Sequence, residues 1–398
     1  MSTRAAPVVH EPSGTGLSIA FVVDRFGSRF GGAEAYGVAL MREFVAAGHR
    51  ITVFAREYDP ACDLRLSFRL IRISRRWPNW IRSWLFARQA ARMTHQGFDI
   101  VHSHMNGWCG DIEVVHVTPV RYRWRVQAMG RVKRGLSYIS PRVQTYLGLE
   151  ARRVAPQPAH RVVAVSQLIA RQLGQAYAMA EPDIPVIPPG VSVEPPVSAD
   201  QRRQSRQALG LPAQGTLCLL VARNPMRKGL PTVLAALQNL PDDVLLLVVG
   251  ANAASRDYVA RAPESVRMRV HLVSETSRVA PYYQAADLYV HPTLNDSFGM
   301  APLEAMSFGL PVILSPVPWC GFAQYVEADK DALVLSHPER ADELAQAIER
   351  LRSDAALRER LQAGMRTVLA RHAWPEVSRQ YLALYADILR ERQTLLDQ

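Results

Sequence analysis

Two acidic residues, Asp296 and Glu304, bracket a segment with the composition of a phosphate-binding helix end. Pro302 lies between them and fits the first turn of a helix, where the missing N–H of proline costs nothing. Unpaired backbone N–H groups and the positive end of the helix dipole coincide at such a terminus, so it attracts phosphate. We predict that these N–H groups belong to Phe298, Gly299 and Met300.

The two acids take different places relative to that phosphate. Glu304 shares a helix face with Met300 and leans toward the helix start, where a carboxylate can accept both hydroxyls of a ribose. Asp296 precedes the helix and can accept hydroxyls from a sugar on the far side of the phosphate. A structural alternative stays open at this point, with Asp296 as a helix N-cap and Glu304 as a solvated acid.

Residues 291–315 resemble the E-x7-E signature of the retaining nucleotide-sugar glycosyltransferases of family 4. The first acid departs from the pattern, because Asp296 stands where the family usually has Glu. This shorter carboxylate keeps the hydrogen-bonding chemistry but lies one methylene further back. The matching positions are Phe298, Gly299, Glu304, Ala305, Met306, Gly309, Pro311 and Val312.

Apolar strands and helical segments alternate in two successive series along the chain, which predicts doubly wound, mostly parallel α/β sheets. A Pro-rich segment at 188–196 reads as a linker between the series. Strands are expected over 17–23, 50–55, 68–73, 99–104, 113–117, 161–165 and 184–187, and then over 216–223, 243–250, 267–273, 286–291, 310–315 and 332–335. Helices are expected over 33–47 and 374–392, among others.

The resemblance implies the GT-B architecture, in which two Rossmann-like domains face a central cleft and a C-terminal helix crosses back to the first domain. At 398 residues the chain is long enough for two such domains. The expected divisions are a flexible tail over 1–15, an acceptor- and membrane-facing domain over 16–190, a nucleotide-sugar-binding domain over 191–373 and the returning helix over 374–398.

Ligands of open α/β sheets bind beyond the carboxyl ends of the strands, so the loop after strand 216–223 is predicted to take part in ligand binding. Arg223 and Lys228 bracket this loop and can both reach a diphosphate. An Arg at the strand end followed by Lys-Gly is similar to the diphosphate-binding pair of the family. Ser274, which directly follows strand 267–273, is assigned to the same donor site.

The first series contributes Gly31-Gly32 and His116 as candidates. Glycines after a first strand permit a close backbone approach, although a simple turn is the usual reading. The resemblance implies that Gly31 and Gly32 contact the donor from the opposing domain and that His116 faces the donor sugar. A half-buried structural histidine is the alternative for His116.

No metal site is expected. His102 and His104 end one strand on the same face, but no third ligand follows at a plausible spacing. Asp329-Lys330-Asp331 has the form of a D-x-D metal motif, yet it reads as a polar turn. We therefore predict neither a metal nor another cofactor.

Residues 1–195 hold 25 of the 47 Lys and Arg residues but only 14 of the 36 Asp and Glu residues, so the formal net charge of +11 lies in this half. Segments 65–92 and 121–134 contain no acid and combine arginines with aromatic residues. This composition favours docking on an anionic membrane, with binding of a phosphorylated acceptor as a compatible reading and nucleic acid as the least favoured one. The candidate contacts are Arg121, Arg123, Trp124, Arg125, Arg131, Lys133 and Arg134.

No apolar run approaches the roughly 20 residues that span a bilayer, and the four cysteines form no C-x-x-C pair. We expect a cytoplasmic protein with reduced thiols, peripherally associated with the inner membrane.

Segments 187–190, 227–229 and 320–326 resemble the lipopolysaccharide core heptose α-1,3-glucosyltransferase group. This resemblance implies a retaining, metal-independent hexosyltransferase that uses UDP-glucose and a cell-envelope glycolipid acceptor such as lipopolysaccharide core. A GDP-mannose-dependent mannosyltransferase, a sugar-nucleotide epimerase and a non-enzymatic membrane-binding protein remain alternatives. The predicted catalytic residues are His116, Arg223, Lys228 and Asp296.

Overall fold

The computed structural model describes residues 16–30 and 32–398, which form two compact units. The N-terminal unit contains the chain up to Pro188 together with Val377–Gln398, and the C-terminal unit contains Pro189–Glu376. The divisions expected after residues 190 and 373 lie close to these points. The tail expected over residues 1–15 and the candidate Gly31 lie outside the described residues.

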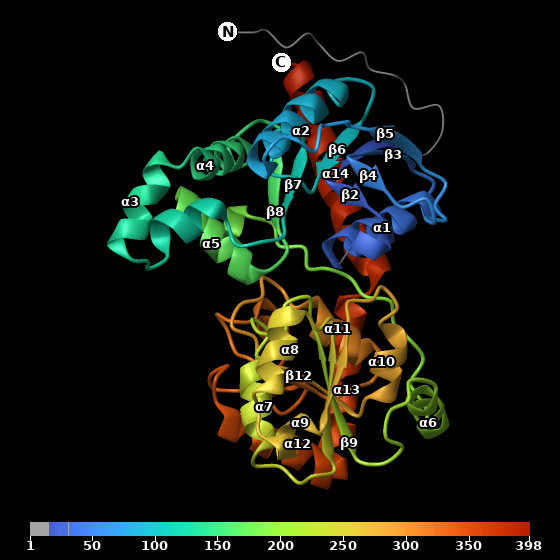
Figure 1. Ribbon diagram of the computed structural model, residues 1–398. Helices are drawn as coiled ribbons and strands as arrows, with labels where there is room; N and C mark the ends of the chain where they lie inside the picture. Colours follow the sequence, from blue (N-terminus) through green and yellow to red (C-terminus); the bar gives the residue numbers. More distant parts are fainter. Residues whose placement is uncertain (1–15, 31) are drawn as a thin grey trace. The chain divides into compact units, whose positions relative to one another are not determined.

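The N-terminal unit is built on a parallel six-stranded sheet with the strand order β5-β3-β1-β6-β7-β8 (Figure 1). The first strand of the chain therefore lies in the middle, paired with β3 on one side and β6 on the other. A short parallel pair, β2 (Arg25–Phe26) and β4 (Glu57–Tyr58), follows the ends of β1 and β3. The sheet strands are β1 (Ser18–Val22), β3 (Arg50–Ala55), β5 (Ser67–Leu70), β6 (Ile100–Ser103), β7 (Ile112–Val115) and β8 (Arg161–Ala164).

Helices cover both faces of this sheet, because alternate residues of the buried strand β1 point to opposite sides. Ala20 and Val22 pack against Phe86 of α2, while Phe21 faces Gly37 of α1. A Cβ at Gly37 would lie 3.0 Å from the Phe21 ring, so the glycine lets α1 approach the sheet. The helices are α1 (Gly32–Ala46), α2 (Asn79–Met93), α3 (Arg131–Ile139), α4 (Pro141–Arg153), α5 (Gln167–Tyr177) and α14 (Trp374–Leu396), with short turns η1 (Ser28–Phe30), η2 (Tyr122–Val126) and η3 (Glu181–Asp183).

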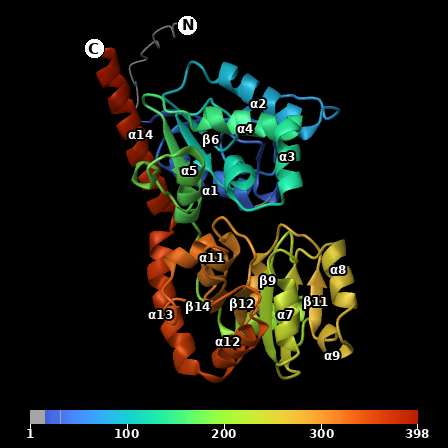
Figure 2. The ribbon, with the colours of Figure 1, turned by 90° about the vertical axis from the view of Figure 1, so that its left-hand side faces the viewer.

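The C-terminal helix α14 returns to the N-terminal unit, as expected (Figures 1 and 2). Its buried side chains include Tyr381 and Tyr385 at the spacing of one helical turn. The hydroxyl of Tyr36 lies 2.9 Å from that of Tyr381, and the hydroxyl of Tyr385 lies 2.5 Å from Nδ1 of the buried His102. These polar contacts fix the register of α14 on α1 and β6.

The C-terminal unit repeats the same topology, with a parallel sheet in the order β11-β10-β9-β12-β13-β14. In each sheet the first strand of the series lies in the middle, and the next strands are added on one side of it before the later ones are added on the other side. The strand order therefore switches between β1 and β6 and between β9 and β12. Ligands of doubly wound sheets bind at the carboxyl ends of the strands near such a switch point. The strands are β9 (Thr216–Val221), β10 (Val244–Val249), β11 (Val270–Val273), β12 (Leu288–His291), β13 (Val312–Leu314) and β14 (Leu333–Val334).

The helices of the C-terminal unit lie on both faces of its sheet (Figure 2). Helix α12 contacts α7, whereas α13 contacts α11 and α10 contacts α6. None of the described helices is both long and apolar enough to cross a membrane. The helices are α6 (Ala199–Ala208), α7 (Leu230–Leu237), α8 (Ala253–Ala260), α9 (Glu264–Arg267), α10 (Ala280–Ala285), α11 (Met300–Ser307), α12 (Ala341–Ser353) and α13 (Ala355–Arg371), with the turn η4 (Gly321–Tyr325).

Candidate functional site

The switch point of the C-terminal unit brings together the loops that follow β9 and β12. The backbone N–H of Leu294 donates to the carbonyl of Arg227 at 3.0 Å, and Lys228 Nζ donates to the carbonyl of Asn295 at 3.2 Å. Gly229 adopts a positive φ of 91°, and a Cβ there would lie 2.0 Å from the carbonyl oxygen of Pro292. The glycine after Lys228 is therefore required for the two loops to approach each other.

This approach pairs the lysine of one loop with the acid of the other. Lys228 Nζ forms an ion pair with Asp296 Oδ2, and both side chains are one-fifth exposed. His291, the last residue of β12, places Nε2 3.0 Å from the same oxygen. His291 was not among the residues predicted from the sequence, although its position at a strand end fits the rule that pointed to Arg223.

The ion pair keeps Asp296 charged. Burial acts to raise the pKa of Asp296, but the hydrogen bond from His291 and the charge of Lys228 outweigh it and hold that pKa well below its usual range. Burial lowers the pKa of His291, so its imidazole is neutral near pH 7. Since Nε2 faces an ionised carboxylate, we assign the imidazole proton to that nitrogen.

Helix α11 begins where the sequence predicts a helix end. Gly299 is its N-cap, with a positive φ of 111°, and Met300 is its first residue. Phe298 is buried, and its ring centroid lies 5.5 Å from that of Phe322, so the turn before α11 is anchored in the core. The first N–H groups of the helix have no acceptor within the helix, which leaves them for a ligand.

Glu304 lies one turn into α11 and is half-buried. Its Oε2 accepts a hydrogen bond from the hydroxyl of Tyr283 at 2.9 Å, and burial raises its pKa. Tyr283 is itself fixed by stacking on Phe308, with ring centroids 5.3 Å apart. The carboxylate is therefore held in place by a neutral donor, and Tyr283 is a contact that the helical spacing alone did not reveal.

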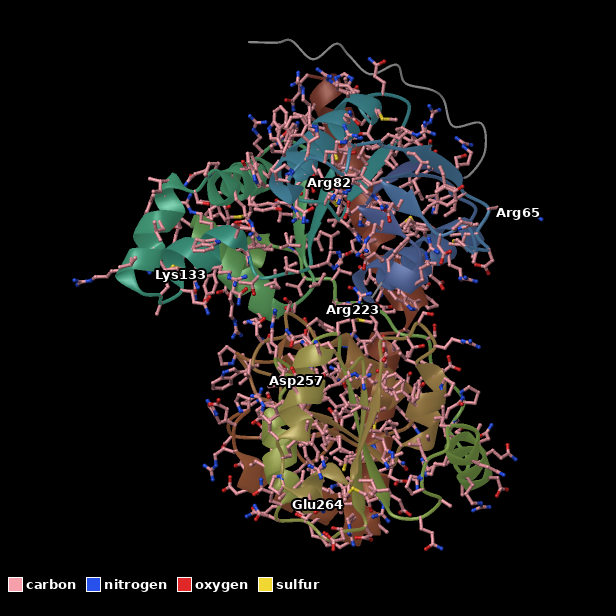
Figure 3. All side chains as sticks on the ribbon, viewed as in Figure 1. Arg65, Arg82, Lys133, Arg223, Asp257 and Glu264 are labelled. Carbon is pink, nitrogen blue, oxygen red and sulfur yellow. The ribbon has the colours of Figure 1, made fainter. Side chains whose placement is uncertain are left out.

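Arg223 and Ser274 lie at the same edge of the sheet but in different contacts. Arg223 follows β9, and its Nε lies 2.8 Å from Oε1 of Glu275, with side chains 53% and 63% exposed (Figure 3). Ser274 follows β11 and accepts a hydrogen bond from Arg256 at 2.8 Å. Because β10 separates β11 from β9, Ser274 lies further along the edge than Lys228 and Asp296.

Three histidines of the N-terminal unit, His102, His104 and His116, lie together at the carboxyl ends of β6 and β7, beside the switch point of that sheet. His104 and His116 have ring centroids 4.5 Å apart, and burial lowers the pKa of His116 to about 3. His116 Nε2 is buried and meets no hydrogen-bond partner within the described residues. His102 and His104 place their Nε2 atoms 3.0 Å apart, and the described residues contain no group of three or more His, Cys, Asp or Glu able to hold a metal. Gly32 starts α1 at this end of the sheet.

The basic segment 121–134 forms η2 and the start of α3, and two of its cations pack on aromatic rings of this region. Arg125 lies over the ring of Tyr138 at 3.9 Å, and Lys133 lies 5.9 Å from the half-buried ring of Trp124 (Figure 3). The most exposed apolar side chains of this region are on α3, where Val132, Leu136 and Ile139 are 78%, 59% and 77% exposed. Arg121, Arg123, Arg131 and Lys133 are exposed, whereas Arg134 is half-buried.

The fold and the two domains together define the class of protein. A model described as Glycosyltransferase Family 4 matches residues 30–195, and one described as Glycosyl transferases group 1 matches residues 201–367. The chain belongs to these glycosyltransferases and has their GT-B architecture of two Rossmann-like domains. The predicted family and fold are confirmed.

Similar proteins that align over most of this chain are named for different substrates. A D-inositol 3-phosphate glycosyltransferase from Xylanimonas cellulosilytica is 29% identical, with 91% of this chain and 93% of the relative covered. The lipopolysaccharide glucosyltransferase WaaG from Escherichia coli K12 is 24% identical, with 88% and 91% covered. The family assignment disfavours the epimerase and the non-enzymatic alternatives.

Solved structures share the fold at lower identity. The crystal structure of WaaG, a glycosyltransferase involved in lipopolysaccharide biosynthesis, has a TM-score of 0.77 at 21% identity and covers 91% of this chain and 98% of its own. Anabaena Alr3699/HepE in complex with UDP and glucose has a TM-score of 0.72 at 18% identity, with 93% and 99% covered. Both likenesses establish the arrangement of strands and helices in each domain.

Proposed function

We propose that this glycosyltransferase takes a hexose from a UDP-sugar, with UDP-glucose as the preferred donor, and transfers it with retention to an anionic cell-envelope glycolipid such as lipopolysaccharide core. The observation that carries the proposal is the meeting of Lys228, Asp296 and the start of α11 at the switch point of the C-terminal unit. HepE structures that contain UDP with glucose, or UDP-glucose, support a UDP-sugar donor. The likeness to WaaG supports glucose and a lipopolysaccharide acceptor.

Three groups stabilise the leaving diphosphate in this proposal. The first N–H groups of α11 and the ammonium of Lys228 face the charge that develops as the bond from the sugar C1 to the phosphate oxygen breaks. Arg223 exchanges Glu275 for a phosphate, because both side chains are more than half exposed and their pair is weakly held. These cations and the helix end supply the stabilising charge, so the proposal includes no metal and no organic cofactor.

The two acids hold the sugars on either side of the diphosphate. Glu304 accepts the ribose hydroxyls, while Tyr283 keeps its carboxylate in place. Asp296 uses Oδ2 to hold Lys228 and has Oδ1 for a hydroxyl of the transferred sugar. A phosphate oxygen of the leaving group takes the acceptor proton on the face where the new C1–O bond forms, which gives retention. The roles of His116, Gly31 and Gly32 stay predictions from the family resemblance.

The acceptor side of the proposal uses the basic N-terminal unit. Exposed Val132, Leu136 and Ile139 lie on one face of α3 at i, i+4 and i+7, next to exposed Arg131 and Lys133. An apolar stripe flanked by cations inserts into the interface of an anionic membrane. Peripheral docking through this stripe would bring the enzyme to a lipid-linked acceptor.

A second acceptor class has its own support. The relative from Xylanimonas cellulosilytica is named for D-inositol 3-phosphate, a small phosphorylated polyol. A soluble phosphorylated acceptor would place the same demand for positive charge on the N-terminal unit but would make the exposed stripe of α3 unnecessary for transfer.

A donor and acceptor panel tests the proposal. Hydrolysis and transfer are measured with UDP-, GDP- and ADP-sugars, each with phosphorylated lipopolysaccharide core, inositol 3-phosphate or no acceptor. We expect a UDP-hexose to be consumed fastest with the phosphorylated core and the product to keep the donor's anomeric configuration. Preference for GDP-mannose would favour the mannosyltransferase alternative, and an inverted product would overturn retention.

A further inference from the structure

The N-terminal unit contains a hollow of about 430 Å³ at the carboxyl ends of β1 and β3. Arg25 and Arg56 line it from the segments that follow these strands, and Arg75 lines it from the loop before α2. Arg82, which is labelled in Figure 3, lines it from α2 itself. Tyr146 of α4 lines the hollow as well. Two of the four arginines come from the basic segment 65–92, and the fold brings Arg25 and Arg56 from two other parts of the chain to the same cavity.

Three of these arginines already have carboxylate partners. Arg56 pairs with Asp24, and Arg75 lies 2.5 Å from an oxygen of Glu57. Arg25 lies 2.8 Å from an oxygen of Glu34, which is not part of the lining. The Arg75–Glu57 pair is open to water, with side chains 79% and 37% exposed, so a stronger anionic ligand can displace it.

Arg82 differs from the other three. Its Nη1 donates to Oδ1 of Asn79 at 3.1 Å, and no carboxylate among the described residues lies within 4.0 Å of its guanidinium. Its Nε is buried and meets no hydrogen-bond partner in the described part of the chain. A buried donor without an acceptor on a charged group is costly, and a bound anion would satisfy both the charge and the N–H.

We propose that this hollow is an acceptor subsite that binds a phosphomonoester on a sugar or polyol, with Arg82 as its central contact. A guanidinium presents two parallel N–H groups that match two phosphate oxygens. Ser83 and Tyr146 line the same hollow, and their hydroxyls are the groups that would contact the sugar hydroxyls. The volume lies in the range of about 300–1,000 Å³ that is typical of small-molecule sites. This inference rests on the proposed function, because it names what the transferase recognises in its acceptor.

Equilibrium binding to the full chain tests the subsite without requiring turnover. The probes are glucose 6-phosphate and inositol 3-phosphate, with glucose and inositol as uncharged controls. We expect the phosphates to bind at least about tenfold more tightly than the uncharged compounds, and Arg82→Ala to remove that difference, as expected for a charge-assisted contact. Arg82→Lys should restore only part of it, because an ammonium cannot match two oxygens at once.

Two further variants separate a binding contact from a general effect. Arg92→Ala removes the same charge from an exposed position of α2 and should leave phosphate binding within about twofold of the wild type. Arg75 is exposed at the hollow, so Arg75→Ala should leave the fold intact and weaken phosphate binding several-fold. This variant tests the subsite if Arg82→Ala folds poorly. Equal weakening by Arg92→Ala and Arg82→Ala, or phosphates that bind no better than the uncharged compounds, would overturn the subsite.

Measuring UDP binding to the same variants separates a failure of this subsite from a failure of the proposed function. UDP should bind Arg82→Ala and the wild type equally, since Lys228, Glu304 and the start of α11, which are proposed to hold the nucleotide, belong to the C-terminal unit and Arg82 is not among the predicted donor contacts. UDP that binds normally while the phosphate probes do not would overturn the subsite and leave the proposed donor site standing. Absence of UDP binding to the wild type would instead contradict the proposed function.

Transfer assays then distinguish the source of the phosphomonoester. One arm offers inositol 3-phosphate in solution, and the other offers phosphorylated or dephosphorylated lipopolysaccharide core in uncharged vesicles. In the arm that supplies the natural acceptor, Arg82→Ala should raise the KM for the phosphorylated compound about tenfold or more, change kcat little and leave the dephosphorylated compound unaffected. An equal loss for both forms of the core, with no effect on inositol 3-phosphate, would overturn the phosphate contact.

Discussion

His291 Nε2 lies 3.0 Å from Oδ2 of Asp296, the oxygen that also pairs with Lys228. The acid at the start of the signature is therefore bound to the end of β12 and to the loop after β9. Its usual counterpart in the family is one methylene longer. In this chain the shorter carboxylate acts as a link between two loops, and we regard Asp296 first as a positioning residue for Lys228.

Asp296→Asn should lower both the stability of the C-terminal unit and the rate of sugar transfer. The amide cannot balance Lys228, so we expect the free energy of unfolding to fall by about 1–3 kcal/mol and kcat to fall at least about tenfold. Asp296→Glu keeps the charge and should retain activity within several-fold of the wild type. Chemical denaturation and steady-state transfer measure the two effects.

The pH dependence of this loss has a defined sign. The folded-state pKa of Asp296 lies below the unfolded value of about 3.9, so its contribution to stability is present above that pH and is lost as the pH falls through the folded pKa. The stability difference between the wild type and Asp296→Asn should therefore be constant from pH 5 to 7 and shrink below about pH 4. Asp257→Asn, at an exposed position of α8, is the matched control (Figure 3) and should show no such difference.

Glu304→Gln should reduce the affinity for UDP through the ribose. Loss of the charged acceptor for two hydroxyls is expected to weaken UDP about tenfold. In the wild type, 2′-deoxy-UDP should bind correspondingly more weakly than UDP, and in Glu304→Gln the two nucleotides should bind more nearly alike. The four affinities, of UDP and 2′-deoxy-UDP for the wild type and for Glu304→Gln, are measured by calorimetric titration. A full preference for UDP in Glu304→Gln would show that another residue holds the ribose.

The N-terminal unit should lose stability in mild acid because its histidines are buried. Burial lowers the pKa of both His102 and His116 to about 3, whereas the unfolded chain binds these protons near pH 6.5. Stability therefore falls as the pH drops from 6.5 toward 3, by about 1.4 kcal/mol per pH unit for each such group. Thermal unfolding of His116→Asn between pH 7 and 5 should show a shallower decline than the wild type.

His95→Asn provides the matched comparison for His116→Asn, since His95 is exposed in the same unit. It should reproduce the wild-type pH profile. An unchanged slope in His116→Asn would contradict the neutral, buried state assigned to His116.

The exposed stripe of α3 should determine membrane affinity. Ser substitutions at Val132, Leu136 and Ile139 remove apolar area from the contact, and Ala substitutions at Arg121, Arg123 and Arg125 remove charge. We expect both sets to weaken binding to anionic liposomes, with the charge set losing its effect at high salt. Sedimentation with liposomes of defined composition measures this, and salt-independent or absent binding of the wild type would contradict membrane docking.

Local patterns in the sequence were sufficient for the fold and for part of the site. Most of the strands, the linker and the helix end at Gly299 follow from apolar runs and from Pro and Gly positions that act over a few residues. The strand expected over 184–187 was wrong, because this segment makes only an isolated bridge from Val186 to Ala164. The order of strands then brings Lys228 close to Asp296, which a family pattern can anticipate. The partner His291 could not be predicted as such, because its contact depends on how the chain turns back after β12.

Burial was the main feature that the sequence left undetermined. Trp124 belongs to a basic aromatic segment, yet it is half-buried, whereas Val132, Leu136 and Ile139 are exposed. Their i, i+4, i+7 spacing was readable, but it is equally typical of a core-facing helix. Arg82 was one of eight arginines in segment 65–92, and only the folded chain separates it from the rest by its buried, unpaired Nε.

The proposed donor site at Lys228 is tested most directly by calorimetric titration of UDP-glucose into the wild type, Lys228→Ala and Lys330→Ala. Lys330 is an exposed lysine that pairs with Glu327 at 2.7 Å, so its variant controls for loss of charge. We predict equal binding by the wild type and Lys330→Ala, and at least about tenfold weaker binding by Lys228→Ala. Binding of UDP-glucose by Lys228→Ala as tight as that of the wild type would contradict a donor site built on Lys228, Asp296 and the start of α11.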